Sequence, residues 1–461
     1  MTVHPNSLHA RDIAHVLHPY TNAKTHESDG PMVISHGEGI YVFDDEGNRY
    51  IEALSGLFCA SLGFSEERLV EAATQQMRKL PFYHTFGHKS NEPVVELAEK
   101  LLALSPVPMS KVFFANSGSE ANDTAMKLVW YYHNAIGKPN KKKIISRVKA
   151  YHGVTIASAS LTGLPNNHRD FDLPIDRVIH TECPGLYRFG KDGETEEEFA
   201  TRCAQALEDL IQREGADTIA AFFAEPVMVS GGCIVPPRTY FDKIQEVLRK
   251  HDILLIADEV ICGFGRTGNM FGCETFGLQP DMITMAKQLS AAYQPISALM
   301  INDKVYRAIV DESGKIGTFG HGFTYGGHPV PAAVALETLK IYEERDIVGH
   351  VRRIAPRFQA GLRKLGEHPL VGEARGVGLV GTLELVKDKR TKETFDPGLG
   401  VAVYAGKRAQ AHGMITRSIG DNFNLCPPLI INEAQIDEMM EKAQLALDDT
   451  LRWVEAGHPT A

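Results

Sequence analysis

Lys287 has the most unusual surroundings of any charged residue in this chain. From Met282 to Ile301 it is the only formally charged side chain. A lysine in apolar surroundings has its ammonium form disfavoured, and the neutral amine can attack a carbonyl to form a Schiff base. The alternative is an ordinary lysine at the start of a helix, whose ammonium reaches solvent along its aliphatic stem. Lys287 by itself does not separate the two interpretations.

Lys287 is one of several reactive groups that stand at the ends of short apolar runs. Residues 112–115, 144–148, 219–224, 253–257 and 282–286 form these runs, with longer helical segments between them. In open α/β sheets, ligands bind outside the carboxyl ends of the strands, so we expect one shared site. The groups at the five ends are Asn116 to Ser119, Tyr151 to Gly153, Glu225, Asp258 with Glu259, and Lys287.

The segment Ser117-Gly118-Ser119-Glu120 stands between an apolar run and a helical pattern. Ser117 and Glu120 fit a capping box, so the segment could be only a helix start. Gly118 would also let the backbone approach a ligand, and the free N–H groups of a helix N-terminus attract phosphate. The chain contains no G-x-x-x-x-G-K-[ST] string, so this is not a nucleotide-binding P-loop.

Asp258 follows a strand that should be buried. A carboxylate at that place must find a cation or hydrogen-bond donors, or remain solvated. A protonated pyridine nitrogen is a suitable partner, because enzymes that use pyridoxal 5′-phosphate (PLP) rely on such a pairing to keep the ring an electron sink. Together with Lys287 and a phosphate-binding loop, Asp258 favours this chemistry.

Two other features of the sequence could indicate a dinucleotide-binding motif or a metal site, and the residues around each argue against it. Residues 376–381 match G-x-G-x-x-G, but a dinucleotide fingerprint must follow a strand and open a helix. Here the pattern continues into a segment typical of a strand, which argues against an NAD-dependent dehydrogenase. The histidines at 84 and 88 and those near the N-terminus, including His18, have no carboxylate or thiol at metal-ligand spacing, so no metal site is expected.

The elements that must position these groups are predicted from the same runs. Apolar strands separated by helices are typical of a mostly parallel sheet buried on both faces. Before them, residues 31–64 alternate with Gly and Asp turns, which indicates a small β unit. We expect an α/β fold with residues 65–330 as a large domain, and with 1–64 and 331–461 as the two parts of a small α+β domain.

Composition limits the classes of function. The net charge is −10, which argues against nucleic-acid binding, because that needs clustered cations. The seven cysteines are scattered without a C-x-x-C pair, so neither a disulfide framework nor a zinc knuckle is expected. The N-terminus lacks the pattern of a secretory leader, and no stretch is long and apolar enough for a transmembrane helix. We therefore expect a cytoplasmic protein without membrane contact.

The chain resembles the class III aminotransferases of PLP fold type I, and among them the ω-amine:pyruvate transaminases. The likeness runs from about residue 15 to about residue 455 and rests on motifs in a fixed order. These motifs are Asn116 to Asn122, Tyr151-His152-Gly153, Glu225-Pro226, Ala257 to Val260, Met285-Ala286-Lys287 and Phe323 to Pro329. The resemblance implies a large domain around a mostly parallel seven-stranded sheet flanked by helices.

The resemblance also implies roles for residues at the site. Lys287 would bind PLP as a Schiff base and carry the substrate proton, Asp258 would pair with the pyridine nitrogen, and Tyr151 would stack on the ring. The remaining cofactor contacts would be Ser117, Gly118, Ser119, His152, Glu225 and Val260, with Phe323 and Thr324 from a second subunit. The substrate would contact Tyr20, Phe58, Phe86, Tyr151 and Arg417. A homodimer with shared sites follows, and tetramers also occur in such families.

Arg417 matches an arginine that binds a substrate carboxylate and moves away for amines that lack one; an exposed surface arginine is the alternative. Glu225 matches a glutamate that can neutralise this arginine. Three positions depart from the family pattern and bear on the substrate range. Gln288 stands where glycine is common, Met228 where glutamine is frequent, and Phe58 where relatives often have tryptophan.

The predicted activity is ping-pong transfer of an amino group from a primary amine or ω-amino acid to pyruvate or a similar keto acid. Other class III activities remain open, namely a γ-aminobutyrate or ornithine-type aminotransferase and an aminomutase. A non-catalytic binding protein is the alternative from another class, but it should lack the lysine or the aspartate.

Overall fold

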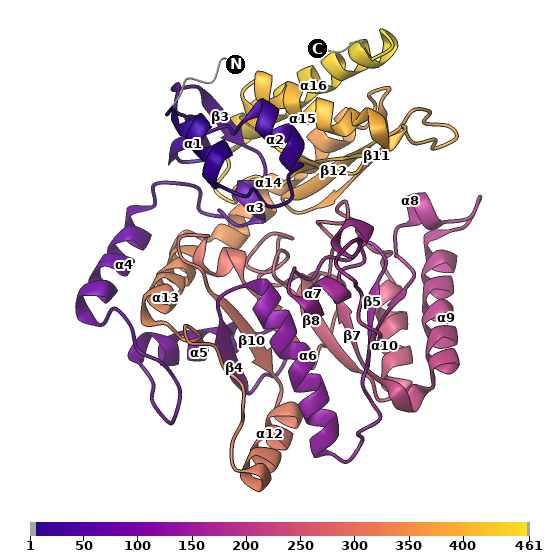
Figure 1. The fold of residues 1–461 in the computed structure, drawn as a ribbon. Coiled ribbons are helices and arrows are strands. Elements are labelled where there is room, and N and C mark those ends of the chain that lie inside the picture. The colour runs from indigo at the N-terminus through magenta and orange to yellow at the C-terminus, as the bar shows by residue number, and fades with distance from the viewer. Residues whose placement is uncertain (1–5, 459–461) are drawn as a thin grey trace.

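A seven-stranded sheet forms the centre of the protein in the computed structural model, which describes residues 6–458 (Figure 1). Its strand order is β4-β10-β9-β8-β7-β5-β6, and only β10 runs against the others. The strands are β4 (Lys111–Ala115), β5 (Lys143–Arg147), β6 (Val178–Thr181), β7 (Ile219–Ala224), β8 (Leu254–Asp258), β9 (Met282–Met285) and β10 (Ser297–Ile301). The predicted mostly parallel seven-stranded sheet is confirmed.

Both faces of this sheet are buried, as its continuous apolar strands require. Along β7, Phe222 and Ala224 point into one hydrophobic cluster, and Ala221 and Phe223 into another. The first cluster is covered by α5 (Glu92–Leu104), α9 (Glu196–Glu214), α10 (Tyr240–Lys250) and α13 (Pro329–Glu344). The second is covered by α6 (Gly118–Ala135), α7 (Ile156–Leu161) and α12 (Asp303–Ile316).

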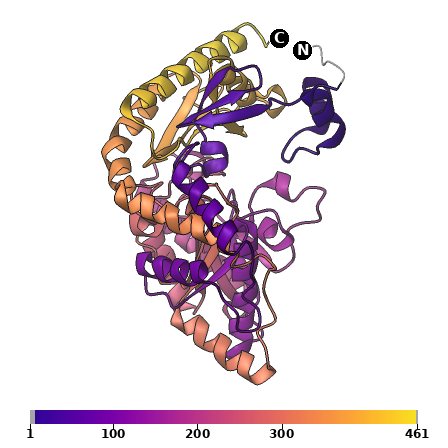
Figure 2. The same ribbon diagram turned by 90° about the vertical axis from the view of Figure 1, so that its left-hand side faces the viewer.

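The elements from the two ends of the chain lie together above the large sheet (Figures 1 and 2). One sheet has the strand order β1-β2-β3-β13. Its strands are β1 (Ile34–Glu38), β2 (Tyr41–Asp44), β3 (Arg49–Glu52) and β13 (Met414–Ile415), and β13 pairs with β3. A second sheet contains β11 (Val371–Val377), β12 (Val380–Leu385), β15 (Asn422–Leu425) and β14 (Arg417–Ile419). Three long helices accompany these sheets, namely α14 (Ile347–Leu365), α15 (Val401–Ala411) and α16 (Glu433–Glu455).

The remaining helices form two groups. α1 (Leu8–His15) and α2 (Ala23–Asp29) precede β1, and α3 (Ser55–Phe58) and α4 (Glu67–Lys79) follow β3. Two short helices, α8 (Leu186–Phe189) and α11 (Gly272–Phe276), lie in connections of the large sheet. The division of the chain at residues 64 and 331 stays a prediction. The structure does not describe residues 1–5 and 459–461, so most of the segment that was searched for a leader pattern lies outside the described residues.

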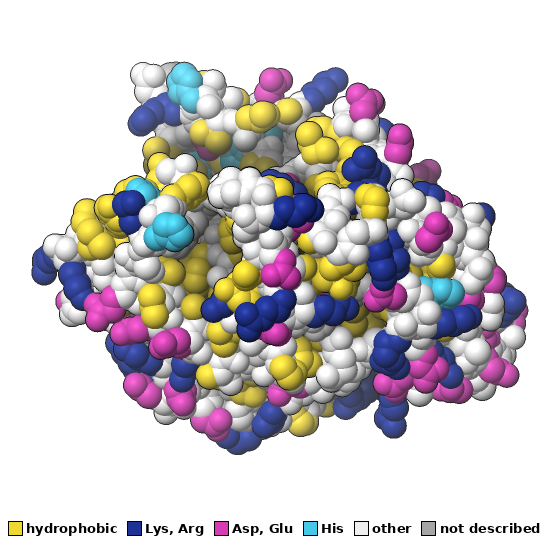
Figure 3. Space-filling view, turned by 90° about the horizontal axis from the view of Figure 1, so that it is seen from below, with side chains coloured by type: hydrophobic (Ala, Val, Ile, Leu, Met, Phe, Trp, Pro, Cys, Tyr) yellow, Lys and Arg dark blue, Asp and Glu magenta, His cyan; other side chains and the backbone are white. Residues whose placement is uncertain are grey.

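Two details bear on the sequence patterns. The glycines of residues 376–381 lie in the antiparallel hairpin of β11 and β12, where Gly378 takes a positive φ of 57°. No helix follows β11, so the dinucleotide interpretation fails, as expected. Cations and anions are interspersed over the face in Figure 3, and Lys and Arg side chains do not gather there as they would on a nucleic-acid surface.

Candidate active site

A cavity of about 600 Å³ opens at the carboxyl ends of the parallel strands. Because parallel strands end at the same edge, the loops after β4, β5, β7, β8 and β9 all reach it. The structure thus brings together nine of the predicted residues: Ser117, Gly118, Ser119, Tyr151, His152, Glu225, Asp258, Val260 and Lys287.

Asp258 is fixed at the floor of this cavity by three donors. Its Oδ2 lies 2.7 Å from His152 Nδ1 and accepts from Asn122 Nδ2 at 2.8 Å. Its Oδ1 accepts from the N–H of Val260 at 3.1 Å. Asn122 is itself held, since its amide donates to His152 O and accepts from Thr284. A carboxylate offers about four acceptor positions, so Asp258 can still receive one further N–H donor.

Asn122 is a residue whose contribution the sequence did not show. It lies one helical turn into α6, and only the packing of α6 against β9 and β8 turns its amide toward Asp258. The signal available was its spacing of four residues from Gly118, which places both on one side of the helix. That spacing alone does not identify a partner.

Lys287 lies directly after β9 on a strained turn. Its φ is +47°, in the left-handed region that side chains other than glycine adopt at a cost. Burial lowers the pKa of the Lys287 ammonium, and nearby Cys59, Asp258 and Glu225 oppose this effect. The result is an amine that loses its proton more readily than a surface lysine.

Gln288 stabilises the turn that contains Lys287. Its Nε2 donates to the carbonyl oxygens of Ile261 at 2.7 Å and Gly263 at 2.9 Å. These carbonyls belong to the loop after β8, so Gln288 ties the Lys287 turn to the loop that follows Asp258. The glutamine at this position therefore adds a contact that a glycine could not make.

The start of α6 offers free donors to the cavity. Ser117 Oγ accepts from the N–H of Glu120 at 3.2 Å, but the Glu120 carboxylate accepts from Asn116 rather than from the Ser117 N–H. The expected capping box is thus incomplete, because Asn116 competes for the carboxylate. Within the described chain, the N–H groups of Gly118 and Ser119 have no acceptor.

Glycine is needed at Gly118 and Gly153 for space. A Cβ on Gly118 would lie 3.1 Å from Val260, and one on Gly153 would lie 2.5 Å from Ser119 Oγ. Both glycines keep the backbone open beside the free N–H groups. The helix dipole of α6 adds a partial positive charge at the same place.

A second, larger cavity of about 1360 Å³, called the outer cavity, shares Tyr151 and Lys287 with the first, the inner cavity. It is also lined by Tyr20, Phe58 and Arg417, as predicted for substrate contacts. The Arg417 guanidinium carbon lies 5.2 Å from the centre of the Tyr20 ring, and Asn167 donates to the Tyr20 hydroxyl at 2.6 Å. The Arg417 guanidinium therefore lies at the cavity over the face of the Tyr20 ring.

Two further groups at the cavity have altered pKa values. Burial raises the pKa of Glu225 to about 7, although the Tyr151 N–H donates to its Oε1 at 3.0 Å. Burial and the adjacent Tyr20 raise the pKa of Tyr151, and Arg417 opposes them. Glu225 can therefore be neutral or charged near neutral pH.

Three predicted contacts are not made within one chain. Phe86, Phe323 and Thr324 line neither of the two cavities. Phe86 lies against Gly322, and the Phe323 ring contacts the His321 and Phe113 rings. Met228, the second departure from the family pattern, packs in a buried cluster with Ala150, Cys183 and Ile234.

The residues present fit PLP. Asp258 has an acceptor position for a pyridinium N–H, and the open N–H groups of Gly118 and Ser119 offer donors to a phosphate. Lys287 supplies an amine in the same cavity. The three features suit one molecule with a cationic ring nitrogen, a carbonyl and a phosphate.

Comparisons with known proteins agree with this fit. The family model of the class III aminotransferases matches residues 23–447. A chloroplastic γ-aminobutyrate transaminase 3 from Solanum lycopersicum is 53% identical over 442 residues, covering 95% of this chain and 85% of the relative. A vanillin aminotransferase from Capsicum annuum is 51% identical over 441 residues, covering 95% and 96%.

Solved structures are equally similar. The crystal structure of the ω-transaminase from Pseudomonas jessenii in complex with PMP superimposes with a TM-score of 0.96 at 57% identity, covering 98% of this chain and all of that one. Among the described residues, no helix is long and apolar enough to cross a membrane. The chain belongs to the class III aminotransferases, a family of PLP-dependent enzymes with fold type I.

Proposed function

We propose that this aminotransferase is an ω-transaminase that moves an amino group from a primary amine or ω-amino acid to pyruvate or a similar keto acid. The observation that carries the proposal is the place of Arg417, which lies in the same cavity as Lys287 and against the Tyr20 ring. A guanidinium there can bind a carboxylate, and the aromatic ring offers it another resting place when the substrate has none.

We assign a proposed task to each of the main residues at the site. PLP, when bound, supplies an electron sink that stabilises negative charge at the substrate carbon. Asp258 holds a proton on the ring nitrogen, and His152 and Asn122 keep its carboxylate oriented. Lys287 Nζ would move the proton from the substrate carbon to the cofactor carbon that bears the transferred nitrogen, since burial lowers its pKa. The α6 N–H groups of Gly118 and Ser119 anchor the phosphate.

The side walls complete the arrangement. Tyr151 and Val260 line the inner cavity where the ring would lie, and Glu225, which also lines it, accepts from the Tyr151 N–H. Tyr20 and Phe58 line the substrate side of the cavity, where Phe58 is buried and Tyr20 is exposed. Val260 contacts Gly118 closely, so the wall and the phosphate anchor form one unit.

We further propose that the enzyme is a homodimer with shared sites, with a tetramer as the alternative. Phe86, Phe323 and Thr324 would then reach the cavity of the partner, which accounts for their distance from their own. The side chains of Phe82, Tyr83, Phe86 and Tyr325 support this, because each is between 37% and 60% exposed. Light scattering behind a sizing column tests the assembly. A cytoplasmic location stays a prediction, and the plant relatives are named as plastid or mitochondrial proteins.

A γ-aminobutyrate transaminase is the second candidate, because several relatives at 51–53% identity carry that name. The same Arg417 would bind the carboxylate of γ-aminobutyrate. The two candidates differ in the range of amines accepted, since an ω-transaminase with Arg417 withdrawn also turns over amines without a carboxylate.

The experiment is a panel of donors assayed by alanine formation from pyruvate, with γ-aminobutyrate, β-alanine and an arylalkyl amine. A kcat/KM for the arylalkyl amine comparable to the values for the two amino acids supports the ω-transaminase. Turnover of γ-aminobutyrate alone supports the second candidate. The Lys287→Ala variant should be inactive with every donor. A folded, colourless protein that never binds PLP would contradict both candidates.

Arg417→Met separates the binding of a carboxylate from the rest of the reaction. The kcat/KM for β-alanine should fall by about 100-fold, because a charge-assisted bidentate contact is worth about 2–3 kcal/mol. The kcat/KM for the arylalkyl amine should be nearly unchanged. Arg363→Met is the matched control, since Arg363 lines the same cavity but is exposed.

A further inference from the structure

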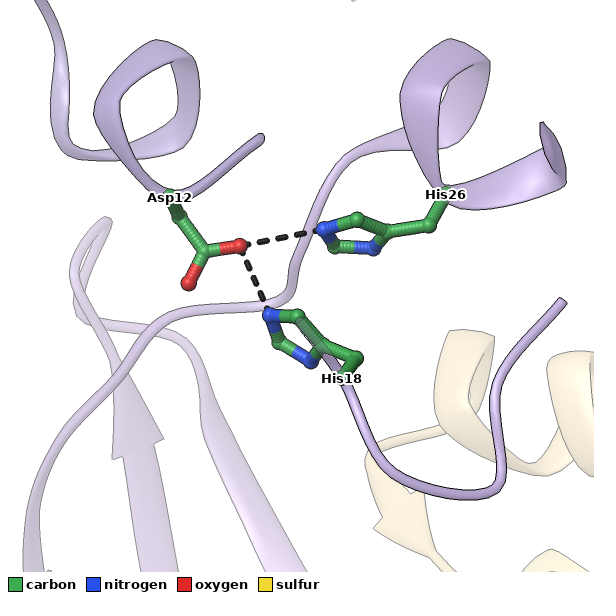
Figure 4. A group of neighbouring side chains, drawn as sticks. All are labelled: Asp12, His18 and His26. Carbon is green, nitrogen blue, oxygen red and sulfur yellow. Dashed lines mark hydrogen bonds and ion pairs between the residues drawn. The ribbon is translucent and has the colours of Figure 1, made fainter. Parts of the chain in front are cut away.

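We propose that Asp12, His18 and His26 form a binding site for Zn²⁺ or a similar late first-row divalent cation. The three residues come from separate pieces of the N-terminal segment: α1, the loop after it, and α2. Figure 4 shows both imidazole rings directing Nε2 at the same carboxylate oxygen of Asp12. This corrects the expectation from the sequence that His18 has no carboxylate nearby, because the turn after α1 folds back on that helix.

The distances suit one shared cation. Asp12 Oδ1 lies 2.7 Å from His18 Nε2 and 3.1 Å from His26 Nε2. All three ligand atoms lie within 4.8 Å of one another. Around a tetrahedral zinc ion with bonds of about 2.0–2.2 Å, ligand atoms are about 3.3–3.6 Å apart, so movements of about an ångström or less would seat the ion. Two imidazoles and a carboxylate are donors that such ions prefer.

The charges also favour a cation between the rings. The His18 and His26 rings lie with their centres 4.1 Å apart, and a single Asp12 oxygen faces both. Two imidazolium ions this close would repel each other, with one carboxylate to neutralise them. A divalent cation uses both imidazoles in their neutral form and is partly neutralised by Asp12.

The surrounding structure shows what the cation would do. Neither α1 nor α2 buries a single residue, so this segment lacks a hydrophobic core of its own. Figure 2 shows the N-terminal helices on the opposite side of the upper part from α16. Small units without a core are commonly stabilised by a metal ion or a disulfide. A cation at this site would join the two helices and close the loop between them.

The closed loop contains Tyr20, two residues after His18. Tyr20 supports Arg417 and bonds to Asn167 at the substrate cavity. A cation held by His18 and His26 would fix the loop on both sides of Tyr20. The side chains of Asp12 and His18 are 23% and 30% exposed, which leaves room for water as the fourth ligand.

The test is a calorimetric titration of Zn²⁺ into the PLP-loaded enzyme after treatment with a chelator. We expect one ion per chain and no comparable binding of Mg²⁺, which prefers oxygen ligands. His26→Gln and Asp12→Asn should each weaken Zn²⁺ binding by more than about tenfold, since even outer partners of metal ligands contribute about 10–100-fold. Zn²⁺ should also slow proteolytic cleavage within residues 16–22.

The matched control is His412→Gln. His412 also bonds to a carboxylate, Asp449, at 2.8 Å, but Arg408 and Arg452 already occupy that carboxylate. This variant should bind Zn²⁺ like the parent. Zn²⁺ binding of undiminished affinity in His26→Gln and Asp12→Asn would place the ion elsewhere, for example at a cysteine, and overturn the proposal. Absence of binding to the parent at high micromolar Zn²⁺ would do the same.

Discussion

Arg417 rests on the face of Tyr20, with its guanidinium carbon 5.2 Å from the ring centre. The Tyr20 hydroxyl is in turn held by Asn167, so the ring has a fixed position beside the cavity. A cation over an aromatic ring is stabilised by about 0.5–2 kcal/mol, depending on its exposure to water. This contact stabilises Arg417 in its position over the Tyr20 ring.

Tyr20→Leu should shift the preference of the enzyme between its two kinds of donor. Without the ring, the withdrawn position of Arg417 loses about 1 kcal/mol, which is about fivefold in an equilibrium. The kcat/KM for an arylalkyl amine should fall by about that factor relative to the kcat/KM for β-alanine. Tyr20→Phe keeps the ring and should keep the ratio. Equal losses for both donors in Tyr20→Leu would mean that the ring does not support Arg417.

The sheet and the inner cavity were predictable because the spacing of apolar residues distinguishes strands from helices, and because the reactive residues stand at the ends of the apolar runs. Continuous apolar runs between helices fixed the parallel strands, and a parallel sheet brings their ends to one edge. The contacts within the site were less accessible. Asn122 and Gln288 act through partners 136 and about 25 residues away in the sequence, and nothing local shows which way an amide points. The contact of Asp12 with His18 depends on how one loop folds back.

Gln288→Ala should slow the reaction and destabilise the fold together. The variant leaves the carbonyls of Ile261 and Gly263 without their donor, and a buried group left unpaired costs about 1–3 kcal/mol. The turn with Lys287 at φ +47° would also lose its tie to the loop after Asp258. We expect a lower unfolding temperature and a several-fold lower kcat, with little change in the KM of the amine donor.

Gln75→Ala is the control for this change, since Gln75 is exposed on α4 and bonds only to Glu71. It should alter neither measurement. A Gln288→Ala enzyme with a lower unfolding temperature but unchanged kcat would show that the glutamine supports the loop without positioning Lys287.

Glu52→Gln should make the protein more stable at alkaline pH. Burial raises the pKa of Glu52 from 4.5 to about 7, against the donation from the Leu54 N–H. The folded state therefore binds more protons than the unfolded state between these values. The stabilisation is full below about pH 4.5 and is lost as the pH rises through 7, with a range of at most about 3 kcal/mol.

Glutamine cannot ionise but can still accept from Leu54. Thermal unfolding of Glu52→Gln and the parent should therefore coincide near pH 5, and the variant should unfold a few degrees higher at pH 8. Glu96→Gln, at an exposed position on α5, should follow the parent at both pH values. A parallel offset of Glu52→Gln at both values would show that the carboxyl does not titrate in this range.

Phe58→Trp should narrow the range of amines. Phe58 is 3% exposed, adopts a positive φ of 62° and lines the outer cavity together with Lys287. The indole would take space from the cavity, so kcat/KM should fall more for a bulky arylalkyl amine than for β-alanine.

The buried cluster around Phe58, which includes Val227, Ile261 and Cys426, limits how the indole can fit. Overpacking of a filled core costs about 1–3 kcal/mol, so the unfolding temperature of the variant should be measured first and both assays run well below it. Phe58→Leu, which removes volume, should change the ratio of the two kcat/KM values in the opposite direction. If Phe58→Trp lowers both values by the same factor, the phenylalanine does not set the size of the amine.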